Sequence, residues 1–347
     1  MLNPYTVSWH DEWSTELNEA LETLPDRECM PHTLYRKLLS RPSGDRRRIA
    51  LVKHRGEPVM LAGLRRHSRF VWEPVGNWHA PGPVFPFRPQ HMYRALRSIS
   101  LEMPLAWWRT GMALPDGPAV QSVETSPTYR MKLDCDPEGY WRKTGYLPTV
   151  KRMRNRCNSF TVKTNHPGTA AWVIRNWRQR WSPIEHTDND SRADLSDRIM
   201  VAEELEKIGR HVTISLFDGD RLVGGTTTFV HQGELVAGVM HCEPEYRAQG
   251  PGVRLIELSF QFGIGQGLQA IDIGGKADYK KKWAPEDGTR SRVVVAPLSV
   301  QYLRKVASTV RALAGRAYVW LLLASIQAVD CDAIGVVVSN VSSGRLL

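Results

Sequence analysis

The chain has 347 residues, and its 46 Lys and Arg against 36 Asp and Glu leave a formal net charge of +10. A hydrophobic fraction of 42% with 12 Trp is ordinary for a globular protein and excludes a disordered, collagen-like or low-complexity chain. At this length a single hydrophobic core stops growing, so two domains are the expected arrangement.

The cysteines and the apolar segments indicate the cellular compartment. Five scattered cysteines without a Cys-x-x-Cys pair argue against structural zinc and a disulfide framework, and we expect no bound metal. The first residues lack the basic start and apolar stretch of a signal peptide. The most apolar run, residues 317–329, is too short for a bilayer, which needs roughly 20 residues, although it suits peripheral membrane contact. These features predict a cytoplasmic protein.

The positive charge favours an anionic partner. Basic residues are spread over short groups, including 46–48, 151–156 and 280–282, rather than concentrated in one tail. No zinc finger or RNP signature accompanies them, which argues against a dedicated nucleic-acid reader. We expect solvated basic faces with one or two phosphate sites, and tRNA or another nucleic acid is the less favoured partner.

The first half of the chain reads as short strands followed by one helix and a final strand. The predicted elements are, in order, a strand at 47–53, a turn at 54–57, strands at 59–64 and 70–78, a Pro-rich loop at 79–90, a helix at 91–102 and a strand at 105–109. A strand, a crossover helix and another strand predict a parallel pair within a mixed sheet.

The second half repeats this order. Its predicted elements are strands at 211–217, 221–230 and 234–241, a turn-rich loop at 243–252, a helix at 253–265 and a strand at 268–273. The distance from Gly56 to Gly219, 163 residues, also relates the loops, the helices and the final strands of the two halves. We infer two copies of one α/β unit with a mixed α+β sheet. The expected divisions are 1–150 for the first copy, 151–312 for the second, and 313–347 for a hydrophobic C-terminal extension.

The loop of the second copy carries the strongest chemical signal. Its Arg-x-x-Gly-x-Gly spacing runs through Arg247, Ala248, Gln249, Gly250, Pro251 and Gly252. Backbone N–H groups at the start of a helix carry partial positive charge and bind phosphate. Glycine allows close approach of a ligand to the backbone, and proline stiffens the first helical turn without loss of a hydrogen bond. An ordinary turn is the alternative interpretation.

This loop resembles the pyrophosphate loop of the GNAT N-acyltransferases, and residues 247–283 resemble the CelD-like branch of that superfamily. The shared features are a Pro-Gly pair at the helix start, a Gly-Leu strand that ends in Asp, a Gly-rich turn and a Tyr-Lys pair. Here they are Pro251-Gly252, Gly267-Leu268 through Asp272, Gly274-Gly275 and Tyr279-Lys280. Residues 141–160 look like the basic helix that precedes the catalytic copy. The turn before Tyr279 is one residue shorter than the family's usual spacing.

The resemblance implies a tandem duplicated GNAT fold, distantly related to the Fem-type aminoacyltransferases. It also implies acetyl-CoA or another acyl-CoA as co-substrate, held by residues 247–252, with Lys280 at a cofactor or acceptor phosphate. The first copy has His79-Ala80-Pro81 at the corresponding place and lacks the glycine spacing, so cofactor binding is assigned only to the second copy.

Four residues are candidate catalytic groups for amide formation from a thioester. The fold implied by the resemblance places Tyr279 to protonate the leaving sulfur, with plain packing as the alternative. His241 and Glu243 stand beside the loop and are candidate bases for the amine, with core and solvated roles as alternatives. Asp272 is a candidate to orient Tyr279 or Lys280, or to bind the acceptor amine.

Alternation along the strand at 234–241 predicts that His241 shares one face with Leu235 and Val239. A nucleophilic role for Cys242 is not expected, because no histidine is paired with it in the required manner.

The predicted function is acyl-CoA-dependent transfer of an acyl group, acetyl in the first instance, in a bacterial enzyme. The expected acceptor bears an amine, and an anionic acceptor suits the charge; an amino sugar or a cell-envelope or polysaccharide precursor fits the resemblance. One alternative is Fem-like transfer from aminoacyl-tRNA, which would use the basic residues at 141–156 and 175–180. Another is acylation of a modified nucleobase or a protein amine. A non-catalytic, GNAT-shaped binding protein is the alternative outside the enzymes.

Overall fold

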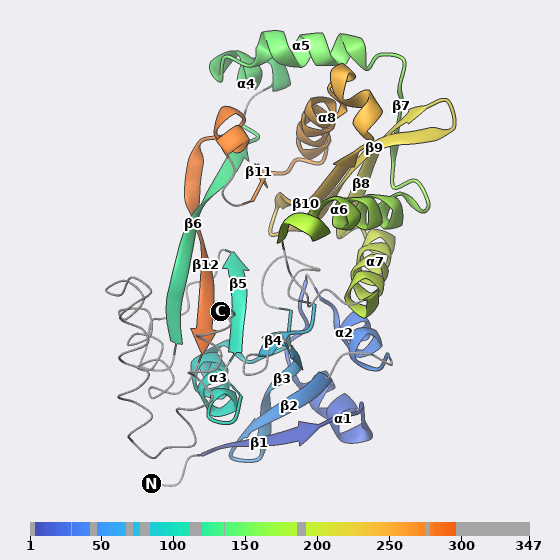
Figure 1. Cartoon of the computed structure of the whole chain (residues 1–347). Helices are drawn as coiled ribbons and strands as arrows, with labels where there is room; N and C mark the ends of the chain where they lie inside the picture. Colours follow the sequence, from blue (N-terminus) through green and yellow to red (C-terminus); the bar gives the residue numbers. More distant parts are fainter. Residues whose placement is uncertain are drawn as a thin grey trace, which may run out of the picture. The chain divides into compact units, whose positions relative to one another are not determined.

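A computed structural model of the whole chain shows the fold (Figure 1). It describes residues 4–28, 30–41, 47–66, 72–76, 84–103, 105–110, 120–134, 136–185, 192–274 and 278–295. The predicted extension at 313–347, the membrane-contact segment at 317–329 and the residues 79–83 of the first copy's loop lie outside these ranges.

Twelve strands of the described residues form one mixed sheet. They are β1 (Tyr5–His10), β2 (Arg47–His54), β3 (Glu57–Arg66), β4 (Trp72–Pro74), β5 (Leu105–Thr110), β6 (Val120–Lys132), β7 (Thr161–Thr164), β8 (His211–Asp218), β9 (Arg221–His231), β10 (Glu234–Cys242), β11 (Ala270–Asp272) and β12 (Glu286–Val295). Their order across the sheet is β1-β2-β3-β4-β5-β12-β6-β11-β10-β9-β8-β7.

The helices lie between groups of these strands in the sequence. The α-helices are α1 (Thr15–Thr23), α2 (His32–Leu39), α3 (Met92–Ser100), α4 (Pro137–Lys143), α5 (Leu147–Arg156), α6 (Thr169–Glu185), α7 (Arg192–Lys207) and α8 (Pro251–Gly265). Short 3-10 helices are η1 (Pro89–His91), η2 (Pro244–Gln249) and η3 (Asp278–Lys282). The basic segment 141–160 was predicted as one helix, and that prediction is wrong. Gly145 adopts a left-handed φ of 73° between α4 and α5 and breaks the helix there.

The predicted duplication is visible in the strand pairing. In the first copy β2 pairs with β3 and β3 with β4 antiparallel, and β4 then pairs with β5 in parallel. In the second copy β8, β9, β10 and β11 repeat the same two antiparallel pairs and one parallel pair. Helix α3 or α8 makes the crossover before each parallel strand. The predicted mixed sheet is confirmed; the divisions at residues 150 and 312 stay predictions.

The two copies exchange one strand each (Figure 1). Strand β6 follows the first copy in sequence but pairs with β11 of the second copy, with Arg130 opposite Asp272. Strand β12 follows the second copy but pairs with β5 of the first, with Val295 opposite Leu105. The long strand β6 also pairs with β12, so the exchanged strands join both copies into one continuous sheet.

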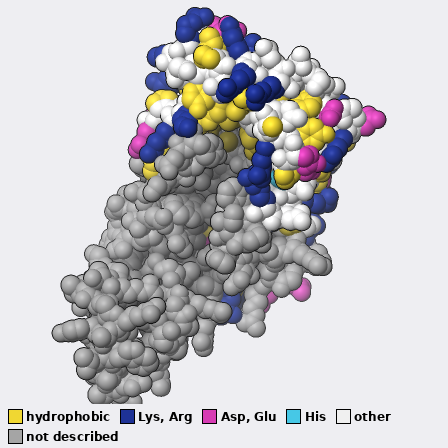
Figure 2. Space-filling view, turned by 45° about the horizontal axis from the view of Figure 1, so that its top comes forward, with side chains coloured by type: hydrophobic (Ala, Val, Ile, Leu, Met, Phe, Trp, Pro, Cys, Tyr) yellow, Lys and Arg dark blue, Asp and Glu magenta, His cyan; other side chains and the backbone are white. Residues whose placement is uncertain are grey.

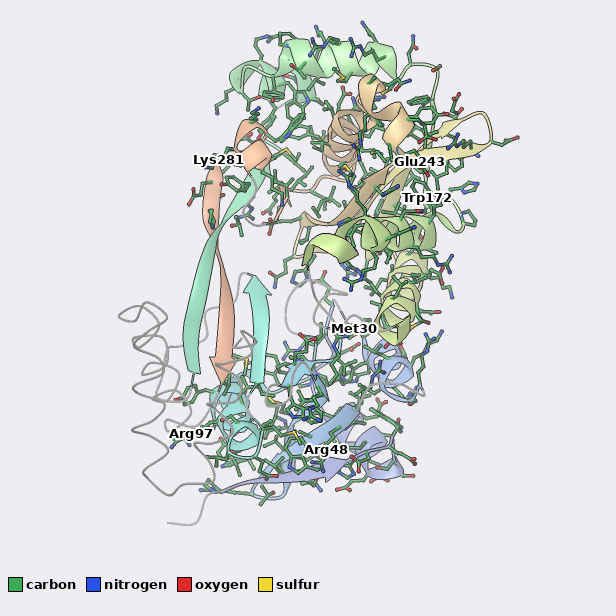
Figure 3. All side chains as sticks on the ribbon, viewed as in Figure 1. Met30, Arg48, Arg97, Trp172, Glu243 and Lys281 are labelled. Carbon is green, nitrogen blue, oxygen red and sulfur yellow. The ribbon has the colours of Figure 1, made fainter. Side chains whose placement is uncertain are left out.

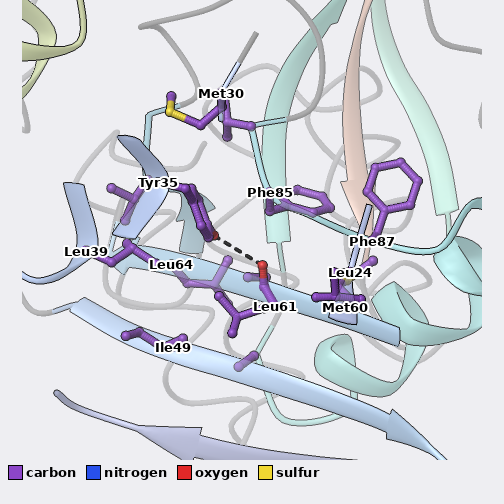
Figure 4. Packing of buried hydrophobic residues seen from close by; sticks show 14 of the residues in the cluster. Leu24, Met30, Tyr35, Leu39, Ile49, Met60, Leu61, Leu64, Phe85 and Phe87 are labelled. Atoms are coloured by element: carbon purple, nitrogen blue, oxygen red, sulfur yellow. Dashed lines mark hydrogen bonds between the residues drawn. The ribbon is translucent and has the colours of Figure 1, made fainter. Parts of the chain in front are cut away.

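The hydrophobic core of the first copy is closely packed around Tyr35 (Figure 4). The Tyr35 hydroxyl accepts a hydrogen bond from the Gly63 amide at 2.7 Å and donates one to the Leu61 carbonyl at 3.2 Å. A Cβ atom at Gly63 would overlap Leu39, so the glycine allows α2 to lie directly on β3. Burial of the Tyr35 side chain raises its pKa.

Helices cover both faces of the second copy's strands (Figure 1). Helix α8 contributes Phe260 and Leu255 to two clusters that contain Leu235 of β10 and Leu216 of β8. Helix α6 contributes Val173 to a separate cluster with Val239 of β10. These helices hold the end of β10, where the candidate site lies, from both sides.

Strand β8 begins with a buried histidine whose ring is not hydrogen bonded. His211 has no exposed surface, and neither ring nitrogen has a hydrogen-bond partner within the described ranges. Its ring contacts the ring of Phe229 edge-on at 5.0 Å. Burial, assisted by the charge of Arg198, lowers the pKa of His211 from 6.5 to about 3.

We expect replacement of His211 with leucine to reduce the acid sensitivity of the fold. Between pH 6.5 and 3 the unfolded chain binds a proton at this residue and the folded chain does not, so stability falls as the pH falls. The lost stability at pH 5 is about 2 kcal/mol. Urea unfolding at pH 5 and pH 8 measures the effect. Relative to the wild type, the free energy of unfolding of His211→Leu should be more favourable at pH 5 than at pH 8. An equal change at both pH values would contradict the prediction.

Candidate active site

Strands β10 and β11 diverge after a short parallel pairing. The pairing ends where Val236 lies opposite Asp272. Beyond that point the register of β10 against β9 shifts between Ala237 and Met240, which marks a β-bulge. The second half of β10 therefore turns away from the end of β11 and leaves backbone N–H groups of β10 without a parallel neighbour.

The side chain of Thr227 stabilises this bulge. Its hydroxyl accepts a hydrogen bond from the Val239 amide at 2.9 Å and lies 3.3 Å from the Val239 carbonyl. A Cβ atom at Gly238 would stand 2.5 Å from the Thr227 hydroxyl and 2.9 Å from its carbonyl oxygen. The bulge therefore needs both a threonine on β9 and a glycine on β10.

The bulge changes the alternation of side chains along β10, so residues beyond it lie on the opposite face from the one that simple alternation predicts. Leu235 packs in the cluster of Phe260, on the α8 side, whereas Val239 packs with Ala170 on the α6 side. His241 also contacts α6. The prediction that His241 and Leu235 share one face is therefore wrong, because an extra residue in a strand inverts the alternation beyond it.

His241 lies at the end of β10, beside the ring of Trp172. Its residue is 7% exposed, and its ring contacts the Trp172 ring edge-on at 5.1 Å. The Nδ1 atom has no hydrogen-bond partner among the described residues. Burial lowers the pKa of His241, and the charges of Arg180 and Arg247 lower it further. The imidazole is therefore neutral at pH 7 and has a nitrogen available to accept a proton.

Glu243 follows directly, where β10 leads into η2. Its amide donates to the Val223 carbonyl at 2.9 Å, and its own carbonyl accepts from the Tyr246 amide at 3.1 Å. Its side chain is half-buried, in the same region as Trp172 (Figure 3). The backbone of Glu243 thus fixes the exit of β10, and both predicted bases lie at this end of the strand.

The predicted phosphate loop forms the start of α8. Gly250 has a left-handed φ of 75°, and Pro251 is the first helical residue. The Gly250 amide donates to the Arg247 carbonyl at 3.1 Å, so it is already engaged within the loop. The first full helical bond runs from the Arg254 amide to the Gly250 carbonyl at 3.3 Å. The Gly252 amide precedes that bond and has no acceptor within the helix.

Helix α5 braces the loop from its outer side. Three of its side chains contact three consecutive loop residues: Met153 stands where a Cβ of Gly250 would be, Arg156 donates to the Ala248 carbonyl at 2.9 Å, and Cys157 lies 3.4 Å from the Gln249 carbonyl. With these carbonyls held by α5, the loop is fixed in one conformation. Sequence reasoning missed this brace.

A buried carboxylate ties α5 to α8 just below the loop. Glu257 is 1% exposed and accepts hydrogen bonds from Arg154, with Nε at 2.7 Å, and from Arg254 at 2.5 Å. Glu138 of α4 lies 3.5 Å from Arg154. The two guanidinium groups and the two carboxylates form one network that joins α4, α5 and α8. The sequence contains a signal for the Arg254–Glu257 pair, because residues three apart lie on one face of a helix.

Asp272 and Lys280 both lie close to Gly274, after the end of β11. Asp272 accepts a hydrogen bond from the Gly274 amide at 2.6 Å, so its carboxylate closes the turn after the strand. The Lys280 ammonium stands 3.4 Å from where a Cβ of Gly274 would be. Tyr279 lies in η3, but its side chain is outside the described residues, as are Gly275 and Lys276. The role of Tyr279 as an acid stays a prediction.

The predicted residues therefore form two groups. His241, Glu243 and the loop lie at the end of β10, whereas Asp272 and Lys280 lie at the end of β11. Figure 3 shows Glu243 in the first region and Lys281, the neighbour of Lys280, in the second. Lys and Arg side chains stand around hydrophobic patches on the described part of the face in Figure 2.

Two further features of the described ranges bear on the predictions. Burial raises the pKa of the Cys242 thiol to about 12, which argues against a nucleophilic thiolate there. No helix in these ranges is long and apolar enough to cross a bilayer, and no cluster of potential metal ligands is found in them.

The family model of the GNAT acetyltransferase domain matches residues 147–281. Residues 147–281 of this chain therefore form a GNAT domain. Its GNAT domain runs from α5 to η3 and contains the bulged strand, His241 and the loop at the start of α8. The predicted enzyme class, an acyltransferase, is confirmed by the same match. No curated protein matches the sequence.

Solved structures resemble the fold of this chain at low sequence identity. The C-terminal domain of a proposed lysylphosphatidylglycerol synthetase from Agrobacterium fabrum superposes with a TM-score of 0.50 at 11% identity, covering 84% of this chain and 96% of that one. A tandem GNAT protein of the clavulanic acid pathway has a TM-score of 0.45 at 13% identity, covering 84% and 99%. The first likeness shows a common fold, and the identities are too low to indicate a substrate.

Proposed function

We propose that this GNAT protein transfers an acyl group, acetyl in the simplest case, from acyl-CoA to an amine. The observation that carries the proposal is the bulged end of β10, which departs from β11 and leads through a glycine-containing loop into the first turn of α8. Acyl-CoA supplies the activated thioester when it is bound. The chain's own residues bind it, orient it and accept the proton of the amine.

The residues at the loop fit a diphosphate. The Gly252 amide has no intrahelical acceptor, and the partial positive charge of a 15-residue helix begins there. A Cβ atom at Gly252 would meet only Met240 at 3.6 Å and Cys242 at 3.9 Å, so the position tolerates a side chain sterically. Arg247 is exposed on the loop, which adds positive charge for an anion. The Gly250 amide contributes by shaping the turn, because its hydrogen is already used.

His241 is the group that we propose as general base. A neutral imidazole with an unpartnered nitrogen can accept a proton from an ammonium or an amine, and its pKa is shifted below 6.5. Glu243 fixes the backbone at the end of β10 and lies two residues after His241 in the chain. Backbone N–H groups of the bulged strand are proposed to stabilise the developing oxyanion of the thioester carbonyl. Tyr279 is proposed to return a proton to the leaving sulfur.

The acceptor that we propose is an anionic amine, such as a phosphorylated or carboxylated amino sugar of the cell envelope or a polysaccharide. The charges of Arg180 and Arg247 act on His241, so an acceptor with a negative group beside its amine is favoured there. Because acyl-CoA is an intracellular metabolite, we place the reaction in the cytoplasm.

Replacement of Gly252 with glutamate is expected to weaken acetyl-CoA binding about 30-fold. The new carboxylate would lie at the start of α8 and repel the diphosphate, while the backbone and packing there accommodate a side chain. Calorimetric titration with acetyl-CoA measures the change. Gly252→Ala is the matched control and should bind within about threefold of the wild type. Wild-type protein that does not bind acetyl-CoA would refute the proposed function.

Transfer from aminoacyl-tRNA is the second candidate. The exposed cations Arg142, Lys143, Lys151 and Arg152 of α4 and α5 favour it, because they form a basic surface of the kind that binds a phosphate backbone. Tight binding of tRNA with a steep dependence on salt, without affinity for acetyl-CoA, would select this candidate. A protein that binds neither would be a non-catalytic member of the superfamily.

A further inference from the structure

Helix α5 presents two arginines beside the phosphate loop that are not neutralised by the protein. Arg152 and Arg156 are both exposed and are four residues apart, so they lie on neighbouring turns of one helix face. Lys151 and Arg154 of the same helix pair with Glu138 and Glu257. Within the described ranges, no carboxylate pairs with Arg152 or Arg156.

Direct contacts hold helix α5, which carries both arginines, next to the loop. Arg156 donates through one nitrogen to the Ala248 carbonyl at 2.9 Å, and Met153 of the same helix fills the space over Gly250. A guanidinium has five N–H donors, so most donors of Arg156 are not used by this bond. Arg152 is one helical turn away and has no hydrogen bond or ion pair within the described part of the chain.

Like charges four residues apart slightly destabilise a helix, and an anion bound between them would relieve the repulsion. Local conflicts of this kind in a folded protein are expected at functional sites. An anion here would be next to the start of α8, on the side of the loop that Met153 and Arg156 of α5 contact. The bulged end of β10, where the thioester is used, is reached from the other end of the loop, through Cys242 and Glu243.

We propose that Arg152 and Arg156 bind the 3′-phosphate of the CoA moiety and so make the GNAT protein selective for CoA over its 3′-dephospho form. This inference rests on the proposed function, because it assigns the diphosphate to the start of α8. A phosphomonoester beyond the diphosphate is the ligand whose geometry and charge fit two guanidinium groups on the outer side of the loop. The proposed 3′-phosphate site is on α5, whereas the proposed base and the diphosphate site are on β10 and at the start of α8.

The test compares the binding of CoA and 3′-dephospho-CoA by calorimetry at one ionic strength. The full-length wild type is expected to bind CoA at least about tenfold more tightly than 3′-dephospho-CoA. Arg152→Gln, which touches no loop residue, should reduce this ratio about threefold, and Arg152→Gln with Arg156→Gln should bring it close to one. The affinity for 3′-dephospho-CoA should change little in Arg152→Gln. Arg142→Gln on α4 removes the same charge away from the loop and should leave the ratio unchanged.

Three outcomes would overturn the inference. A wild type that binds both ligands equally has no 3′-phosphate site. A ratio that survives both substitutions places that site elsewhere. Equal weakening of both ligands by the Arg156 substitution, with no effect of Arg152→Gln, makes Arg156 a brace of the loop only. In each of these cases CoA still binds, so the proposed function stands, whereas a wild type that binds neither ligand refutes the proposed function as well.

Discussion

Replacing His241 with glutamine is expected to lower kcat about 1000-fold while the affinity for acetyl-CoA stays nearly unchanged. Glutamine is similar in size and keeps a polar atom near Trp172, but it cannot accept a proton at neutral pH. The loss corresponds to about 4 kcal/mol of transition-state stabilisation. The release of free CoA from acetyl-CoA, with glucosamine and its phosphates among a panel of amines, measures the rate.

The pH profile provides a second readout for the same histidine. Because the pKa of His241 lies below 6.5, the wild type should keep its activity at neutral pH and lose it as the pH falls through that lowered value, where the imidazole becomes protonated. His241→Gln should lose this acid limb together with the rate. His166→Gln is the matched control, because that ring contacts Phe217 instead. Unchanged kcat and an unchanged acid limb in His241→Gln would assign the base to another group.

Replacing Gly238 with alanine is expected to lower kcat about 100-fold and to reduce the free energy of unfolding by about 2 kcal/mol. The added Cβ would stand 2.5 Å from the Thr227 hydroxyl and 2.9 Å from the Thr227 carbonyl, so the bulge must shift. A shifted bulge moves both the backbone N–H groups and the His241 ring relative to the thioester. Misplacement of about 1 Å is enough for such a loss of rate.

Enzyme kinetics and urea unfolding of the same preparation measure both effects. Gly265→Ala, at the last residue of α8, is the control, because nothing lies within 4 Å of a Cβ atom there. It should leave kcat unchanged and should not destabilise the fold. If Gly238→Ala keeps full kcat with lowered stability, the bulge is a packing feature without a catalytic task.

The duplication could be predicted from the sequence because turn residues and apolar periodicity report local structure. The predicted strand at 211–217 is observed as His211–Asp218, and the predicted helix at 253–265 as Pro251–Gly265. Gly56 and Gly219, which set the offset between the copies, both have positive φ in corresponding hairpin turns, at 89° and 59°. Such turns require glycine for their own backbone, so the signal does not depend on distant contacts.

The arrangement within the site could be predicted only in part. The loop at 247–252 and its place at the start of a helix follow from local spacing. The bulge of β10 does not, because it depends on Thr227 from the neighbouring strand, and alternation alone therefore put His241 on the wrong face. The brace by α5 depends on contacts between residues about 90 positions apart, such as Arg156 with Ala248. No pattern within one segment reports such a contact.

The exchanged strands have a consequence for how this protein can evolve. A gene segment that encodes one copy alone would leave an open sheet edge, with β5 lacking β12 or β11 lacking β6. Loss of either copy would therefore expose an unpaired strand edge in the other, so the two copies depend on each other as halves of one scaffold.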